Sequence, residues 1–182
     1  MKAGRAIQIL FFLVVLCGVL SPCAHAQANS APAAVNLIAV RNPGIAVAAF
    51  PANVNFALFN GAVATGSAPI TITTTWDVSP SAGNLTLYAY FSTAIAALSN
   101  GAGNNIASSR VLGSVNGGAF APFTGISPYA AGSSLQIFTF RVLGLNRRGT
   151  RNDTLNLQID LTGAVLPAGT YSGTLLIQAQ AL

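Results

Sequence analysis

The sequence has very little charge. Only 6% of its 182 residues are charged, against about 25% in an ordinary soluble domain, and it contains no glutamate and a single histidine. Apolar residues make up 52% of the chain, enough to offset the entropy cost of folding, which argues against intrinsic disorder. So little charge also argues against a cytosolic enzyme.

The start of the chain is organised like a secretory signal peptide. A short basic segment precedes residues 9–20, a run of 12 residues that are apolar except for one glycine, and residues 24–26 supply the small side chains of a cleavage site. The run is shorter than the roughly 20 residues of a membrane-spanning helix. Alternatives are a retained membrane anchor and a lipoprotein attached through Cys23. We expect a signal peptide over 1–26, one domain over 27–182, and no transmembrane span after cleavage.

Removing this segment removes every cysteine, histidine, methionine and lysine of the chain. The remaining 156 residues (182 less 26) have a net charge of +3 in place of +5, because two cations are lost. Serine hydrolysis through a histidine base, thiol chemistry and the usual zinc sites all need residues that are missing. Three excess arginines are too few for a nucleic-acid-binding surface. We therefore expect no enzyme activity, catalytic residue, cofactor, metal or nucleic-acid partner.

The three aspartates are the remaining candidates for acid–base chemistry, since two carboxylates can act as an acid and base pair. Asp77 and Asp160 fall on the polar phase of alternating segments, and Asp153 is expected in a turn. All three are therefore predicted to be solvated surface residues.

Alternation of apolar and polar residues predicts strands and almost no helix. It is clearest in residues 70–78, 85–91 and 155–161, each of which places one face on a core and one in water. Only residues 93–98, rich in alanine, have the composition of a helical turn. Weaker alternation predicts further strands at 35–40, 45–50, 54–59, 108–115, 119–123, 134–143 and 169–181.

Turn-forming clusters separate these segments. Asn116, Gly117 and Gly118 lie between two of them and predict a hairpin turn, because asparagine and glycine accept positive φ angles. About eight to ten short strands at this spacing predict an all-β fold, an immunoglobulin-like antiparallel β-sandwich.

Two groups of side chains are candidates for surface binding. Arg147, Arg148 and Arg151 form the one concentrated group of charges after residue 26, between two predicted strands. They are expected at a hydrated hairpin tip that discourages edge aggregation, or as a contact for an anionic surface or polysaccharide. Tyr88 and Tyr90 share the outer face of their predicted strand. They are expected to pack against neighbouring strands or to stack on a sugar ring.

The C-terminal segment carries a resemblance to known families. The sequence PAGTY at 167–171 enters a long apolar strand that ends the chain. This resembles the closing turn and strand of spore-coat-U-like and chaperone-usher pilin subunits, secreted bacterial proteins. The resemblance implies an incomplete immunoglobulin-like sandwich that is completed by an extended strand from another subunit.

Two segments are candidates for such strand exchange or edge pairing. Leu175, Leu176 and Ile177 are apolar on both phases, so this strand is expected to be covered on both faces and to need a partner along its edge. Near the N-terminus Val35, Leu37 and Ala39 alternate, following Ala33, as in a donor strand or as in the first strand of the protein's own sheet.

Together these features predict a secreted, non-catalytic structural or surface protein, in the form of a pilin-like subunit that assembles by strand addition. Its partners would be further copies, other surface subunits or a periplasmic chaperone, and its location the periplasm, the cell surface or the medium. An extracellular carbohydrate-binding module is one alternative. A small outer-membrane β-barrel is another, since barrel strands also alternate.

Overall fold

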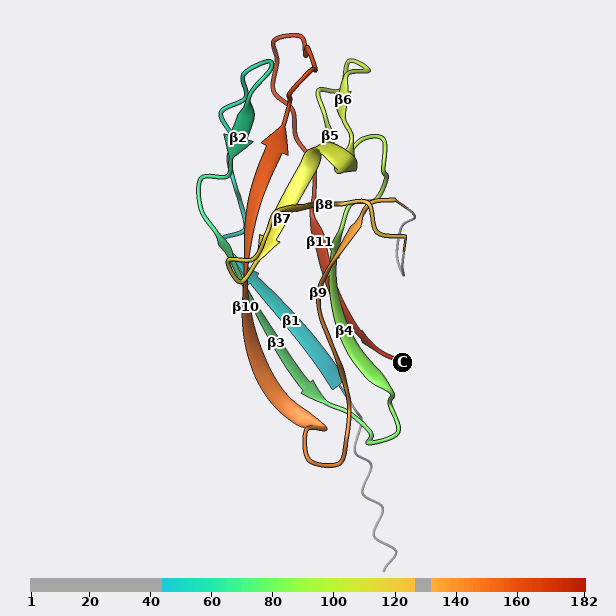
Figure 1. Cartoon of the computed structure of the whole chain (residues 1–182). Coiled ribbons are helices and arrows are strands. Elements are labelled where there is room, and N and C mark those ends of the chain that lie inside the picture. Colours follow the sequence, from blue (N-terminus) through green and yellow to red (C-terminus); the bar gives the residue numbers. More distant parts are fainter. Residues whose placement is uncertain (1–43, 127–131) are drawn as a thin grey trace, which may run out of the picture. The chain divides into compact units, whose positions relative to one another are not determined.

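The computed structural model describes residues 44–126 and 132–182, and these residues form eleven strands and one short 3₁₀ helix, η1 (Ser108–Arg110) (Figure 1). The strands are β1 (Gly44–Phe50), β2 (Val63–Thr65), β3 (Ile70–Asp77), β4 (Asn84–Tyr90), β5 (Leu98–Ser99), β6 (Asn105–Ile106), β7 (Val111–Val115), β8 (Ala121–Pro122), β9 (Ser134–Arg141), β10 (Arg148–Asp160) and β11 (Leu176–Ala181). In this described part of the chain no helix has the length and apolar character needed to cross a membrane. The predicted signal peptide and the predicted strand 35–40 lie outside it.

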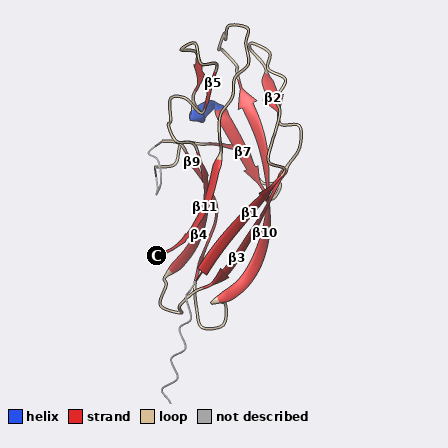
Figure 2. Ribbon diagram, turned by 180° about the vertical axis from the view of Figure 1, so that it is seen from behind, coloured by secondary structure: helices blue, strands red, loops and turns tan. Residues whose placement is uncertain are grey.

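Nine of the strands form two antiparallel sheets that pack against each other, and β5 and β6 form a separate two-stranded sheet (Figure 2). The first sheet has the order β1-β3-β10-β7-β8, with β2 also paired to β10, and the second has the order β11-β4-β9. The 13 residues of β10 run through the first sheet, pairing with β3 and β2 on one edge and with β7 on the other. This arrangement confirms the predicted all-β antiparallel sandwich.

The core lies between the two sheets and uses the apolar phase of the alternating strands. Phe91 and Phe123 meet edge to face there, with ring centroids 5.2 Å apart. Burial of each large apolar side chain contributes about 1.5–3 kcal/mol relative to exposure. The large apolar side chains that are fully buried are Ile72, Leu85, Leu87, Ile106, Val111, Phe123, Val142, Leu155, Ile159 and Leu161.

The turn after β7 has the predicted geometry. Asn116 and Gly117 have φ angles of 51° and 75°, and the Gly118 amide donates to the Val115 carbonyl oxygen over 2.9 Å. An Asn-Gly pair supplies two positive φ angles at low cost, so the predicted hairpin is confirmed. Its second strand is only two residues long, and η1 replaces the start of the predicted strand 108–115.

Several predicted elements differ from the structure. Residues 93–98 form no helical turn, and residues 54–59 pair only through an isolated bridge from Phe56 to Gly66. The last strand begins at Leu176 rather than at residue 169. Residues 54–59 and 169–175 have the alternating side chains of a strand. Neither segment pairs with a neighbouring strand along its full length, because both border a groove.

Candidate functional site

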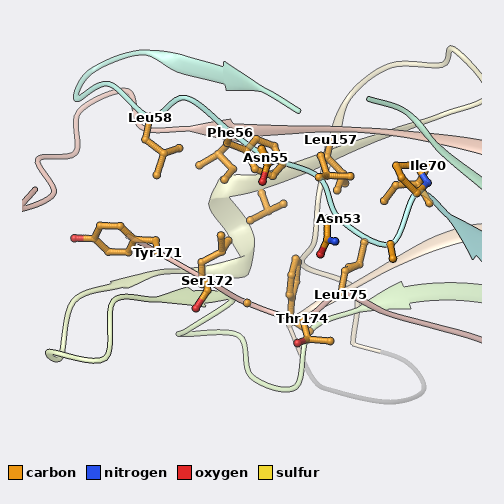
Figure 3. Close-up of a pocket in the computed structure, with 18 of the residues that line it drawn as sticks. Asn53, Asn55, Phe56, Leu58, Ile70, Leu157, Tyr171, Ser172, Thr174 and Leu175 are labelled. Carbon is orange, nitrogen blue, oxygen red and sulfur yellow. The ribbon is translucent and has the colours of Figure 1, made fainter. Parts of the chain in front are cut away.

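A groove opens between the two sheets, beyond the end of β1 and before the start of β11. Its volume is about 760 Å³. One wall is the segment 51–58 that follows β1, and the other is the segment 169–177 that leads into β11 (Figure 3). We call this feature the groove throughout.

The first wall is an extended chain with alternating side chains. Val54, Phe56 and Leu58 are half-buried, whereas Asn53 and Asn55 between them are exposed. The Asn55 backbone bonds to the segment behind it: its carbonyl accepts from the Ser67 amide (2.9 Å) and its amide donates to Ser67 Oγ (3.0 Å). Successive residues of an extended chain direct their backbone groups to opposite edges, so those of Val54 and Phe56 face the other way.

The second wall has the same character. Tyr171 and Leu175 are half-buried, and Thr170 and Thr174 are exposed. Ser172 is held by two backbone hydrogen bonds with Ser99, of 2.9 and 3.0 Å. The ladder between β11 and β4 begins only at Leu176, so residues 173–175 take part in no ladder of the described chain, although Gly173 lies against Ala97 and Leu98.

The floor between these walls is part of the core. It consists of apolar side chains from β3, β7 and β10 and of Phe91, which follows β4, and Figure 3 labels Ile70 and Leu157 among them. The groove lining has no aspartate and no arginine; its one ionisable side chain is Tyr171. An extended, neutral ligand in the groove would therefore meet backbone groups of the walls and an apolar floor. The lining contains no acid–base pair for catalysis. The floor residues are Ile70, Phe91, Val111, Leu157 and Ile159.

The predicted edge-pairing residues divide between two faces. Leu175 and Ile177 line the groove. Leu176 points to the opposite face, beside Tyr90, and is 39% exposed. Within the described chain alone, this face of the strand is therefore uncovered at Leu176. Val35, Leu37 and Ala39 lie outside the described residues.

The arginine cluster is not at a hairpin tip. Arg148 and Arg151 belong to β10, and the turn that precedes the strand ends before them. Arg148 of β10 forms an ion pair with Asp77 of the neighbouring strand β3 (Nε to Oδ1, 3.0 Å), and both side chains are well exposed. Arg147 is half-buried just before β10. The expectation of a hydrated tip fails because β10 extends seven residues further towards the N-terminus than its apolar alternation indicated.

Arg151 reaches across to the other sheet, although 41% of its side chain stays exposed. Its guanidinium carbon lies 4.8 Å from the centroid of the Phe138 ring, which belongs to β9 of the other sheet. Its Nε and Nη2 donate to the Asp153 carboxylate over 2.8 to 3.0 Å. Arg151 thus contacts Phe138 of the other sheet and Asp153 of its own strand.

Asp153 is buried in β10, which corrects its predicted place in a solvated turn. Its side chain is 0% exposed and also accepts a hydrogen bond from Asn116 Nδ2 (2.7 Å). Burial raises the pKa of this carboxyl, but the hydrogen bonds from Arg151 and Asn116 and the Arg151 charge outweigh it, so the pKa lies below its ordinary value. These contacts make Asp153 a structural anchor for the turn after β7.

Asp160 is half-buried at the other end of β10. The Thr162 backbone amide donates to its Oδ1 over 2.8 Å. Hydrogen bonding to Thr162 is the main cause that lowers the pKa of this carboxyl, and the charge of Arg110 adds to it. The three aspartates lie apart, and in the described chain no three His, Cys, Asp or Glu side chains gather as a metal site would need.

Tyr88 and Tyr90 lie half-buried on the outer face of the second sheet, as predicted. Tyr88 Oη donates to Gln136 Oε1 over 3.4 Å, and Tyr90 Oη donates to Gln178 Oε1 over 3.2 Å. The arginines belong to the other sheet, so the structure does not combine the two groups into one surface.

The groove itself was not predicted from the sequence. Alternation identified both walls as extended chain, and Leu175, Leu176 and Ile177 indicated an edge for the second wall, but no residue pattern indicated that the first would lack a neighbour. Comparison of the sequence with protein-family models and with curated proteins gave no match.

Proposed function

We propose that this protein is a secreted, non-catalytic structural subunit that assembles by accepting an extended strand from another chain into the groove. The observation that carries the proposal is the groove, with two extended walls and an apolar floor. An edge that exposes backbone groups above apolar pockets is the arrangement that β-strand addition uses.

The chemistry of the groove favours an extended, uncharged, apolar segment. Half-buried side chains alternate along both walls, so an added strand would place every second side chain against the floor. Burial of three or four such side chains contributes on the order of 5–10 kcal/mol before the cost of ordering the strand. A charged peptide would meet no compensating partner in this lining, which makes its binding unfavourable.

The segment 33–40 of the same sequence has the required pattern, with Val35, Leu37 and Ala39 on one phase. The proposed donor is this segment from another copy of the chain, and a periplasmic chaperone is the alternative occupant of the groove.

The test uses neighbouring leucines on opposite faces. Leu175→Asn places an amide in the groove lining, whereas Leu176→Asn changes the outer face of the same segment. The full chain should form oligomers that size-exclusion chromatography resolves. Leu175→Asn should shorten the oligomer distribution and Leu176→Asn should leave it unchanged, with both variants folded by circular dichroism. A strictly monomeric wild-type chain would overturn the proposal.

One observation favours carbohydrate binding as a second candidate function. Tyr88 and Tyr90 place two aromatic rings on the outer face of the second sheet, each beside a glutamine amide that can bond to sugar hydroxyls. Tyr88→Ala with Tyr90→Ala should abolish retention on a neutral polysaccharide column. A glycan array on which the wild-type chain binds nothing excludes this function.

A further inference from the structure

The turn between β9 and β10 presents two leucines to solvent at one end of the sandwich (Figure 1). Leu145 is fully exposed and Leu143 is 53% exposed. Single exposed leucines are common on globular proteins, so their exposure alone indicates no function. This turn differs from an ordinary loop because it is fixed in place and because arginines flank it. We call residues 142–147 the leucine turn.

Hydrogen bonds fix the leucine turn to the sandwich. The Asn146 side chain accepts from the Leu143 amide and donates to the Arg141 carbonyl over 2.9 Å. The Asn146 carbonyl accepts from Trp76 Nε1, also over 2.9 Å, which ties the turn to β3 of the other sheet. Because the turn is held from both sheets, Leu145 stays at its tip and does not fold back onto apolar surface.

Three arginines flank the leucine turn, one from each sheet and one from the turn itself. Arg141 is the last residue of β9, in the second sheet, and Arg148 is the first residue of β10, in the first sheet. Both are exposed, and Arg147 between them is half-buried. The exposed leucines therefore lie between cations that both sheets supply.

These arginines have few acidic partners. The chain has three carboxylate side chains, all aspartates, and two of the three lie further along β10. The third, Asp77, pairs with Arg148. Neither Arg141 nor Arg147 pairs with a carboxylate of the described chain. The leucine turn therefore combines exposed apolar side chains with excess positive charge.

The exposed apolar residues beside the other end of β10 lack this charge. Phe59 is 70% exposed and Val165 is 85% exposed. Arg110 reaches the same end, but its guanidinium donates to the backbone carbonyls of Asp160 and Thr162 over 3.0 and 3.2 Å. Its charge also lies close enough to the Asp160 carboxylate to lower the pKa of that group. This end is therefore a natural control for apolar exposure without excess charge.

We propose that the leucine turn inserts into the surface of an anionic phospholipid bilayer, with Leu145 among the acyl chains and the three arginines at the level of the phosphates. A bilayer surface supplies both features that the turn requires, since an apolar layer lies directly beneath negatively charged headgroups. A dissolved anionic polymer would pair with the arginines but would leave Leu145 in water. The contact adds membrane attachment to the proposed function and is independent of strand addition, because it involves neither wall of the groove.

Tryptophan fluorescence tests the insertion at the tip of the turn. The emission of Leu145→Trp in the full chain should move to shorter wavelength, and brominated lipids should quench it, when vesicles of phosphatidylglycerol and phosphatidylcholine are added. The wild-type chain, whose one tryptophan is Trp76, gives the background spectrum. Val165→Trp, at the opposite end of β10, should show neither change, because the readout is local. No change in Leu145→Trp, or equal changes in both variants, would overturn the proposal.

The same emission change, titrated against lipid, tests the arginines. Adding Arg141→Gln or Arg147→Gln should each weaken binding about 5-fold, the equivalent of about 1 kcal/mol for one cation at an anionic surface. Raising the salt from about 0.1 to 1 M should weaken it as well, because the screening length falls from about 10 to 3 Å. Binding that neither change weakens would contradict the assigned role of the arginines.

A further comparison separates this inference from strand addition. Adding Leu175→Asn, which changes the groove, should leave the emission change of Leu145→Trp intact. Loss of oligomers with retained insertion therefore contradicts nothing here, and retained oligomers without insertion refute the membrane contact alone. A chain that cosediments with the vesicles while the Leu145→Trp emission stays unchanged binds by charge alone or through another surface, and insertion of the leucine turn is then wrong.

Discussion

Replacing Asp153 with asparagine tests how much the buried ion pair stabilises the sandwich. The carboxylate is 0% exposed and accepts three short contacts from Arg151 and one of 2.7 Å from Asn116. Hydrogen bonds to a charged group contribute about 1.5–3 kcal/mol each, and loss of one partner of a buried pair costs about 3–5 kcal/mol. Arg151 is 41% exposed, so water can hydrate its charge in the variant. We therefore expect a loss of about 2–3 kcal/mol.

Urea unfolding followed by circular dichroism measures this loss as a lower midpoint at an unchanged m-value. The matched control is Asp77→Asn, which removes an exposed pair and should cost less than about 1 kcal/mol. If Asp153→Asn unfolds at the same urea concentration as Asp77→Asn, the buried pair does not stabilise the fold and the reasoning is refuted.

The pH dependence follows from the same contacts. The pKa of Asp153 is lowered in the folded protein, so its contribution to stability is fully present above the ordinary aspartate pKa of about 3.9. As the pH falls below that value towards the lowered folded pKa, the contribution is lost, because the carboxyl takes up a proton more readily in the unfolded chain. Wild type should therefore lose more stability than Asp153→Asn between about pH 5 and the acid limit.

Two further substitutions test the packing around the groove and in the core. Gly173→Ala would place a Cβ 1.9 Å from the backbone oxygen of Ala97, so it should displace the second groove wall and reduce oligomer formation; Gly144→Ala, which meets nothing within 4 Å, should not. Phe123→Ala should lower the free energy of unfolding by about 3–5 kcal/mol, because Phe123 is fully buried. Phe120→Ala, at a partly exposed neighbour, should cost less than half as much in the same urea titration.

Local alternation was sufficient to predict the strands that have partners on both sides. Residues 70–78, 85–91 and 155–161 alternate because one face meets the other sheet, and the structure places β3, β4 and β10 there. The Asn-Gly turn was predictable for a similarly local reason, its backbone geometry. The strands and the turn could be predicted because they depend only on residues close in sequence and on the presence of an apolar core, which every β-sandwich has.

The groove and the buried pair depend on information that is not local. Residues 54–59 alternate as well as a paired strand does, and only the arrangement of the sheets reveals the missing neighbour. Asp153 did carry a signal, since it is in phase with Leu155 and Leu157, but its charge favoured a solvated turn before the strand. The carboxylate is accommodated inside because Arg151 and Asn116 lie within hydrogen-bonding distance.

Filling of the groove by an extended strand is the central claim, and a peptide titration tests it most directly. In the full chain, Leu37→Asn disables the donor segment and leaves the groove free for a fluorescein-labelled peptide of residues 30–42. Fluorescence anisotropy should show saturable binding. Adding Leu175→Asn should weaken it by about 10- to 100-fold, the equivalent of one lost leucine contact, and adding Leu176→Asn should leave it unchanged. Absence of saturable binding, or equal binding by all three variants, would contradict the account.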